Sequence, residues 1–127
     1  GLLRMKFALM ITTKPSDPKT ITALNIAQAI IEQSHELVGI FFYQEGVLNA
    51  SKYLCLPNDE FQTPSKWQAF SKQSNVPLHL CSTAAEKHGL LEETDKNDFE
   101  HILSEFQMSG LGQLVEVTVQ AERVIKL

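Results

Sequence analysis

Two apolar runs separated by a helical pattern constrain the fold of this chain more than any other feature. Residues 6–12 (KFALMIT) and 36–43 (ELVGIFFY) are apolar on both faces, which is typical of strands inside a parallel sheet. Between them, Asp17 and Pro18 form a helix start, and apolar residues then recur at helical period as far as Ser34. This order of strand, helix and strand predicts a right-handed parallel crossover.

The rest of the chain continues to alternate between helical and strand patterns. Thr83 and Glu86 form a capping box, and Asn97 and Glu100 form a weaker capping pair. The expected elements are a short helix after Gly46, a helix over 63–74, a strand over 78–81, a helix from about Ala84, a helix carrying Phe99, Ile102, Leu103 and Phe106, a helix from the SGLGQ turn at 109–113 to about Val119, and a strand over 123–127. We predict one α/β domain with a mostly parallel sheet of about five strands.

Composition and charge exclude some classes of function. The 127 residues carry 11 Lys and Arg against 15 Asp and Glu, which gives a net charge of −4. Direct binding to nucleic acid is not expected, because phosphate contacts need clustered Lys and Arg. No apolar stretch approaches the roughly 20 residues that span a bilayer, so no membrane contact is expected.

The spacing of cysteine and histidine bears on redox state and metal binding. Cys55 and Cys81 form neither a disulfide framework nor a CxxC pair, so we expect free thiols in the reducing cytoplasm. Cys55 lies among apolar residues and is interpreted as an ordinary packed thiol. The histidines at 35, 79, 88 and 101 match no zinc-ligand spacing, and no metal is expected.

Cys81 is the main candidate for chemistry. It ends the third expected strand, and reactive groups gather at the carboxyl ends of strands in parallel sheets. The expected helix cap at Thr83 places unpaired N–H groups and the positive end of a helix dipole beside the thiol, which favours a thiolate. His79, on the same strand face, is a candidate helper. From position alone, however, burial as a small apolar residue is the commoner outcome for a cysteine.

Two further motifs have ordinary interpretations. The GxG at Gly110 and Gly112 lacks the third glycine of a dinucleotide fingerprint, because Val115 occupies that place. A tight turn into a helix is favoured, with a glycine-lined wall beside the thiol as an additional role. The acidic run at 92–100 is interpreted as a solvated face or as a dock for a basic partner.

Several stretches, taken together and in order, resemble the DsrE-like sulfurtransferase family, in particular its branch in the sulfur relay for tRNA 2-thiouridine synthesis. They are KFALMITT at the start, HELVGIFFYQEGVLNA at 35–50, NDEF at 58–61, LHLCSTAAEKHG at 78–89, SGLGQLVE at 109–116 and ERVIKL at 122–127. Together they span nearly the whole chain from Met5 onward. The chain departs from the family pattern mainly at 14–20, where the sequence is KPSDPKT.

The resemblance implies a flavodoxin-like three-layer domain over residues 5–127, preceded at 1–4 by an expression remnant or an upstream start. It implies a sulfurtransferase subunit that carries sulfane sulfur as a persulfide on Cys81, without metal or cofactor. The candidate supporting residues are Ser82, Thr83, His79, Gly110 and Gly112. The implied partners are TusC-like and TusB-like paralogues in a dimer of heterotrimers, a TusA-like sulfur donor and a TusE-like (DsrC-like) acceptor.

Three alternatives stay open at this point. A related DsrE branch serves bacterial sulfur oxidation. A non-catalytic assembly subunit would use Cys81 only for packing. A small-ligand module of flavodoxin shape ranks last, because the loop after the first strand, TTKPSDP, lacks the glycines of a phosphate loop.

Overall fold

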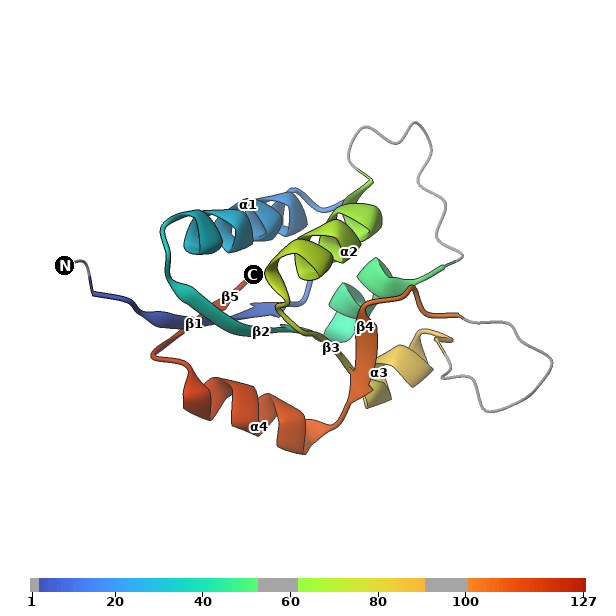
Figure 1. Cartoon of the computed structure of the whole chain (residues 1–127). Helices are drawn as coiled ribbons and strands as arrows, with labels where there is room; N and C mark the ends of the chain where they lie inside the picture. Colours follow the sequence, from blue (N-terminus) through green and yellow to red (C-terminus); the bar gives the residue numbers. More distant parts are fainter. Residues whose placement is uncertain (1–2, 53–61, 91–100) are drawn as a thin grey trace.

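A computed structural model of the chain describes residues 3–52, 62–90 and 101–127. Its elements are β1 (Lys6–Ile11), α1 (Pro18–Glu32), β2 (Glu36–Phe42), η1 (Gln44–Ala50), α2 (Thr63–Ser74), β3 (Leu78–Cys81), α3 (Ser82–Lys87), β4 (Phe106–Ser109), α4 (Leu111–Gln120) and β5 (Arg123–Lys126). The strands form one five-stranded sheet in which every neighbouring pair is parallel. Helices α1 and α2 cover one face of this sheet and α4 covers the other (Figure 1). The predicted α/β class, with three layers and a parallel sheet, is confirmed.

The order of the strands determines which strand ends meet. The sheet runs β4-β3-β2-β1-β5, so the chain moves one strand at a time from β1 to β4 and then returns to the far side of β1. This order differs from the 2-1-3-4-5 order of flavodoxin itself. It places the carboxyl ends of β2, β3 and β4 next to one another, and these ends hold the candidate site.

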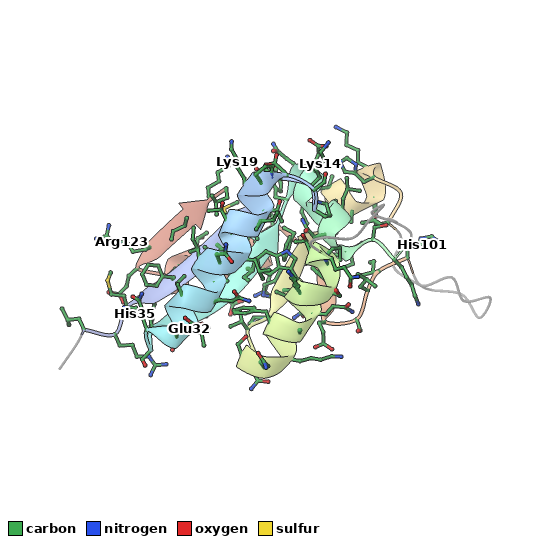
Figure 2. The ribbon with its side chains drawn as sticks, turned by 90° about the horizontal axis from the view of Figure 1, so that it is seen from above. Lys14, Lys19, Glu32, His35, His101 and Arg123 are labelled. Atoms are coloured by element: carbon green, nitrogen blue, oxygen red, sulfur yellow. The ribbon has the colours of Figure 1, made fainter. Side chains whose placement is uncertain are left out.

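The first strand-helix-strand unit follows the sequence prediction closely. The side chain of Asp17 caps α1 by accepting a hydrogen bond of 2.8 Å from the backbone N–H of Lys19. The helix ends at Glu32, two residues before the predicted end at Ser34, which has a left-handed backbone with φ of 63°. Figure 2, seen from above, shows α1 beside α2, with Lys14 and Lys19 near the start of α1 and Glu32 near its end.

Gly46 fixes how η1 crosses the end of β1. A Cβ atom added at this position would lie 2.0 Å from the carbonyl oxygen of Ile11. The backbone of η1 therefore approaches β1 more closely than any other residue type allows. This contact holds η1 against the end of β1, at the edge of the sheet where the site is found.

Buried side chains hold the loop between β1 and α1. Thr20 Oγ1 donates to the carbonyl of Lys14 at 2.6 Å, and Asn49 Nδ2 donates to the carbonyl of Thr13 at 3.1 Å. Thr63 Oγ1 donates to the carbonyl of Pro15 at 3.2 Å. These bonds give three carbonyl groups of the loop a hydrogen-bond partner inside the protein.

The predicted helix around Phe106 is wrong. Ile102 forms an isolated bridge with Ser51, and Phe106 begins strand β4, which pairs with β3. The other part of that prediction, including Asn97, Phe99 and Glu100, lies outside the described residues. Pairing with an existing strand outweighs a helical spacing that rests on only a few apolar residues.

The two faces of the sheet are packed unequally. On the side of α1 and α2, Phe42 packs edge-on against Trp67 and against Phe106, and Trp67 is fully buried. On the other side, the buried Val117 of α4 lies over Gly39 of β2, where an added Cβ would be 3.3 Å away. The outer side of α4 exposes three aliphatic residues at four-residue spacing, which we call the α4 stripe: Leu111, Val115 and Val119.

Candidate functional site

Cys81 belongs to a strand and caps a helix. It is the last residue of β3 and the N-cap of α3, with φ −63° and ψ 115°, and its thiol is free and partly exposed. The predicted capping box of Thr83 and Glu86 is wrong, because α3 already begins at Ser82 and no side chain caps it. The helix starts as soon as the strand ends, so the cap position falls on the cysteine.

The neighbouring strand brings Tyr43 to the same place. Phe42 of β2 is the register partner of Leu80 of β3, so the next residues, Tyr43 and Cys81, follow side by side at the strand ends. Side chains alternate across a sheet, and both residues therefore face away from the buried Phe42 and Leu80. Both line the pocket described next.

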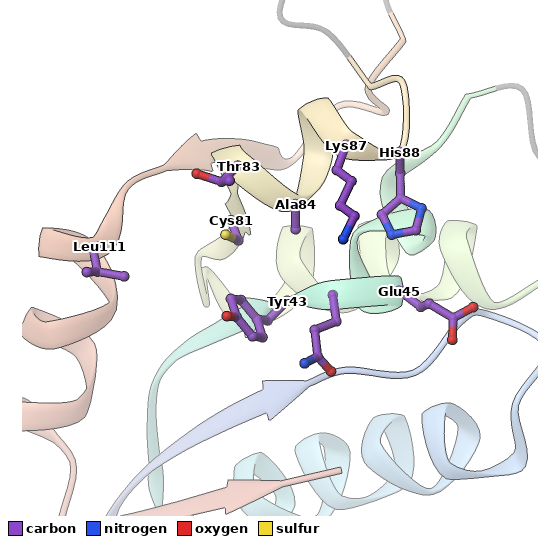
Figure 3. A pocket seen from close by; sticks show the side chains of 9 residues that line it. Tyr43, Glu45, Cys81, Thr83, Ala84, Lys87, His88 and Leu111 are labelled. Atoms are coloured by element: carbon purple, nitrogen blue, oxygen red, sulfur yellow. The ribbon is translucent and has the colours of Figure 1, made fainter.

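A pocket of about 680 Å³ opens at this edge of the sheet (Figure 3). It is lined by Tyr43, Gln44, Glu45, Cys81, Thr83, Ala84, Lys87, His88 and Leu111. These residues come from the position after β2, the start of η1, helix α3 with the residues that cap its two ends, and the start of α4. Gln44 has a left-handed backbone, with φ of 53°, which is uncommon for a residue other than glycine.

Polar side chains of opposite kind lie on two walls of the pocket. Figure 3 shows the side chains of Lys87, at the end of α3, and His88, which follows it, pointing into the pocket, while Glu45 comes from η1 on the opposite wall. Within the described part of the chain, the one salt bridge joins Arg4 to Glu36, far from this pocket. Lys87 and Glu45 therefore have no ionic partner among those residues.

His79 lies beneath the site and does not line the pocket. It is buried, with 4% of its surface exposed, and its ring stacks on Phe41. Its Nδ1 lies 2.9 Å from Oγ of Ser109, which is the register partner of Cys81. Burial lowers the pKa of His79 below its ordinary value of 6.5, and the negative charge of Glu116 opposes this shift. His79 therefore reaches the edge that holds Cys81 only through Ser109.

The other predicted supporting residues have different places. Thr83 lines the pocket, whereas Ser82 does not. Gly110 caps α4 and Gly112 lies in its first turn, and neither lines the pocket. Leu111, between the two glycines, lines it instead. The SGLGQ turn thus contributes the side chain of Leu111 to the pocket wall, and not the two glycines expected there.

Tyr43, Glu45 and Leu111 are pocket residues that the sequence reasoning missed. Tyr43 ends the second predicted strand, and the rule that reactive groups gather at strand ends applies to it as it does to Cys81. Glu45 and Leu111 carry no comparable signal, because the strand order alone brings their segments together. Cys55 and the acidic run at 92–100 lie outside the described residues.

The described ranges hold neither a metal cluster nor a membrane-spanning helix. Residues 3–52, 62–90 and 101–127 contain no cluster of three or more His, Cys, Asp or Glu side chains that could hold a metal ion. In the same ranges, no helix combines the length and the apolar composition needed to cross a membrane.

The fold and the pocket define a three-layer α/β domain with a cysteine at the carboxyl edge of a parallel sheet, and comparison with known proteins agrees. The sequence model of the DsrE/DsrF-like family matches residues 5–127, so the chain belongs to this family. It is 34% identical to the sulfurtransferase TusD of Enterobacter sp. (strain 638), covering 96% of this chain and 99% of that protein. It is 38% identical to a sulfurtransferase TusD homolog of Vibrio vulnificus (strain YJ016), covering 83% of each. The crystal structure of the ychN protein from E. coli has the same fold, with a TM-score of 0.77 at 16% identity, over 98% of this chain and 100% of that one.

Proposed function

We propose that this chain is a sulfurtransferase subunit that carries one sulfane sulfur as a persulfide on Cys81 and passes it to a thiol of an acceptor protein. The observation that carries the proposal is the place of Cys81, a partly exposed free thiol at the end of β3 on the wall of a pocket. The family and the relatives named as sulfurtransferases support this class of reaction.

The proposed cycle consists of two displacements at sulfur. In the first, the Cys81 thiolate attacks the outer sulfur of a donor persulfide, the S–S bond of the donor breaks, and the donor leaves as a thiolate. In the second, the acceptor thiolate attacks the outer sulfur on Cys81, and the Cys81 thiolate leaves. Each step forms one S–S bond and breaks one, so the cycle exchanges no net electrons and requires no added oxidant or reductant.

Neighbouring residues have supporting roles in this proposal. The Thr83 hydroxyl, on the pocket wall, is a hydrogen-bond donor for a sulfur anion, and Ser82 supplies a backbone N–H at the first position of α3. His79 acts at a distance by holding Ser109. Gly110 and Gly112 flank Leu111, a lining residue of the pocket, and a Cβ added at either glycine would have no atom within 4 Å, so their proposed role is to leave the space around Leu111 open.

Mass spectrometry of the loaded protein tests the proposal directly. Incubation with a cysteine desulfurase and cysteine should add about 32 Da, the mass of one sulfur atom, at Cys81. The chain contains a matched control, because Cys55 is its other cysteine. Cys55→Ser should still take up sulfur, whereas Cys81→Ser should not. Loading that leaves Cys81 unmodified would contradict the proposal.

A second measurement separates a carrier from an assembly subunit. In a reconstituted relay, Cys81→Ala should abolish transfer to the acceptor while complex formation with the partner subunits persists. Full transfer by Cys81→Ala would mean that the cysteine only packs and that the chain serves assembly.

We also propose that the sulfur is destined for 2-thiouridine at the tRNA wobble position. The relatives named TusD favour this branch over DsrE-type sulfur oxidation. The chain would act in the cytoplasm with TusC-like and TusB-like subunits, a TusA-like donor and a TusE-like acceptor, and would not contact RNA or membrane itself. Deletion of its gene should lower the 2-thiouridine content of tRNA, and the wild-type gene, but not Cys81→Ser, should restore it.

The α4 stripe supports an assembled state. Leu111, Val115 and Val119 have 73%, 55% and 77% of their surfaces exposed, on one side of a helix. Aliphatic side chains that line up in this way on an exposed helix favour contact with another protein. In the proposed complex, a paralogous subunit covers the part of this stripe formed by Val115 and Val119, which do not line the pocket.

A further inference from the structure

The pocket beside Cys81 is larger than sulfur transfer by itself needs. Its volume of about 680 Å³ lies within the range of sites that enclose a whole small ligand. A single sulfur atom on Cys81 would occupy only a small part of it. The remaining space is available to the molecule that brings or removes the sulfur.

The lining of the pocket follows α3 from Cys81, which caps its start, to Lys87 at its end. Cys81 caps the start of this helix and Lys87 is its last residue, so the two are separated by about 9 Å along the axis at 1.5 Å per residue. An extended peptide covers this length with about three residues, at about 3.3 Å per residue. When the sulfur-bearing residue of such a segment lies at Cys81 and the segment runs along α3, the residue three positions away from it lies at Lys87.

Charge distinguishes the Lys87 end of the pocket from the rest. The chain as a whole has a net charge of −4, yet the ammonium group of Lys87 points into the pocket from the end of α3 (Figure 3). No carboxylate of the described residues pairs with Lys87, and Glu45 lies on the opposite wall, on η1. A carboxylate entering along α3 would meet an ammonium group there that pairs with no described carboxylate.

We propose that the pocket binds an extended segment of a partner protein, in which a carboxylate lies about three residues from the thiol that exchanges sulfur with Cys81. Lys87 binds this carboxylate, and Leu111 contacts the segment at the other end, beyond Cys81. The inference rests on the proposed function of Cys81, because it describes the protein that takes part in the transfer. It identifies Lys87 as the residue that selects among thiol-bearing partners.

Activated peptides test this docking without any persulfide. The probes are two peptides, Cys-Gly-Gly-Asp and Cys-Gly-Gly-Asn, each with its thiol blocked as a thiopyridyl disulfide and its ends capped. In a Cys55→Ser background, the Cys81 thiolate attacks the peptide sulfur and releases thiopyridone, whose absorbance gives the rate. The reversed sequences, Asp-Gly-Gly-Cys and Asn-Gly-Gly-Cys, cover the other chain direction.

We expect the aspartate peptide to react about three- to fivefold faster than the asparagine peptide in at least one chain direction, as for a modest ion pair. This ratio should fall toward one in Lys87→Gln and at high salt. Lys87→Glu should reverse it and should favour a peptide with lysine in place of aspartate. Lys72→Gln, on α2, should leave the ratio unchanged.

The proposal is overturned if Lys87→Gln retains the wild-type ratio, or if Cys81 reacts with none of the peptides while iodoacetamide still modifies it. The two proposals fail separately. Peptide discrimination without sulfur uptake at Cys81 would leave the docking in place and remove the transferase function. Sulfur uptake at Cys81 without discrimination between the peptides would leave the transferase function in place and remove the docking.

Discussion

The Oγ atom of Ser109 lies 2.9 Å from the Nδ1 atom of His79, and Ser109 is the register partner of Cys81. A buried polar pair thus joins β3 to β4 just beneath the exposed thiol. Ser109 Oγ also lies 3.4 Å from the carbonyl oxygen of Gln107. When the hydroxyl donates to that carbonyl, it accepts from the Nδ1–H of neutral His79. Burial lowers the pKa of His79, so the folded state favours the uncharged ring in this pair.

Acidification should destabilise the protein through His79. Its pKa is lowered in the folded chain by burial, so the unfolded chain binds more protons as the pH falls through about 6.5. Stability from this group is present above that pH and is lost below it. Urea unfolding between pH 8 and pH 5 should show a smaller loss in His79→Gln than in the wild type. His88→Gln, at an exposed position, is the control, and an unchanged pH dependence in His79→Gln would refute the assignment.

Gly46→Ala should destabilise the fold by about 2 to 3 kcal/mol, as overpacking against backbone does. The added Cβ would lie 2.0 Å from the carbonyl oxygen of Ile11, so η1 must move away from β1. Gly112→Ala is the matched control, because nothing lies within 4 Å of its added Cβ. Chemical denaturation measures both, and equal stability of the two variants would count against the close approach of η1.

Trp67→Phe should cost much less stability than Trp67→Ala. The indole is fully buried and packs edge-on against Phe42 and Phe70, so truncation to alanine should cost about 3 to 5 kcal/mol. Its Nε1 has no hydrogen-bond partner among the described residues, so phenylalanine gives up no hydrogen bond to them and should cost about 1 to 2 kcal/mol. Thermal unfolding followed by circular dichroism separates the two. A Trp67→Phe loss as large as that of alanine would point to a polar contact of the indole.

Val119→Asp should leave the isolated chain stable to within about 0.5 kcal/mol, because Val119 has 77% of its surface exposed. The same change should weaken co-purification with the paralogous subunits, since it places a charge in the α4 stripe. Gln28→Asp, an exposed position on α1 across the sheet, provides the comparison. Undiminished co-purification of Val119→Asp would show that another surface mediates assembly.

The sequence predicts the first half of the sheet better than the second, for a physical reason. β1, α1 and β2 are long enough for their apolar periods to be unambiguous, and Asp17 and Pro18 mark the helix start. β4 has only four residues, and the sequence around Phe106 fits a helix as well as a strand. Pairing with β3 decides in favour of the strand, and this pairing is not visible in the local sequence.

The candidate site shows the same division. Cys81 can be selected from the sequence, because the end of a buried strand is a local property. Tyr43 is its neighbour only through the pairing of β2 with β3, and Leu111 joins them only through the path of β4 into α4. The indirect place of His79 depends on its contact with Ser109, thirty residues along the chain.

The fixed backbone of Cys81 determines the order in which donor and acceptor proteins can bind. Its backbone belongs to β3, which lies between two neighbouring strands, and it also caps α3. The thiol therefore stays in one place and cannot move from one partner to another. In the proposed cycle, donor and acceptor must therefore visit the same pocket in turn, and each excludes the other while it is seated. The kinetics should be those of a double displacement, in which a large excess of either partner slows the relay.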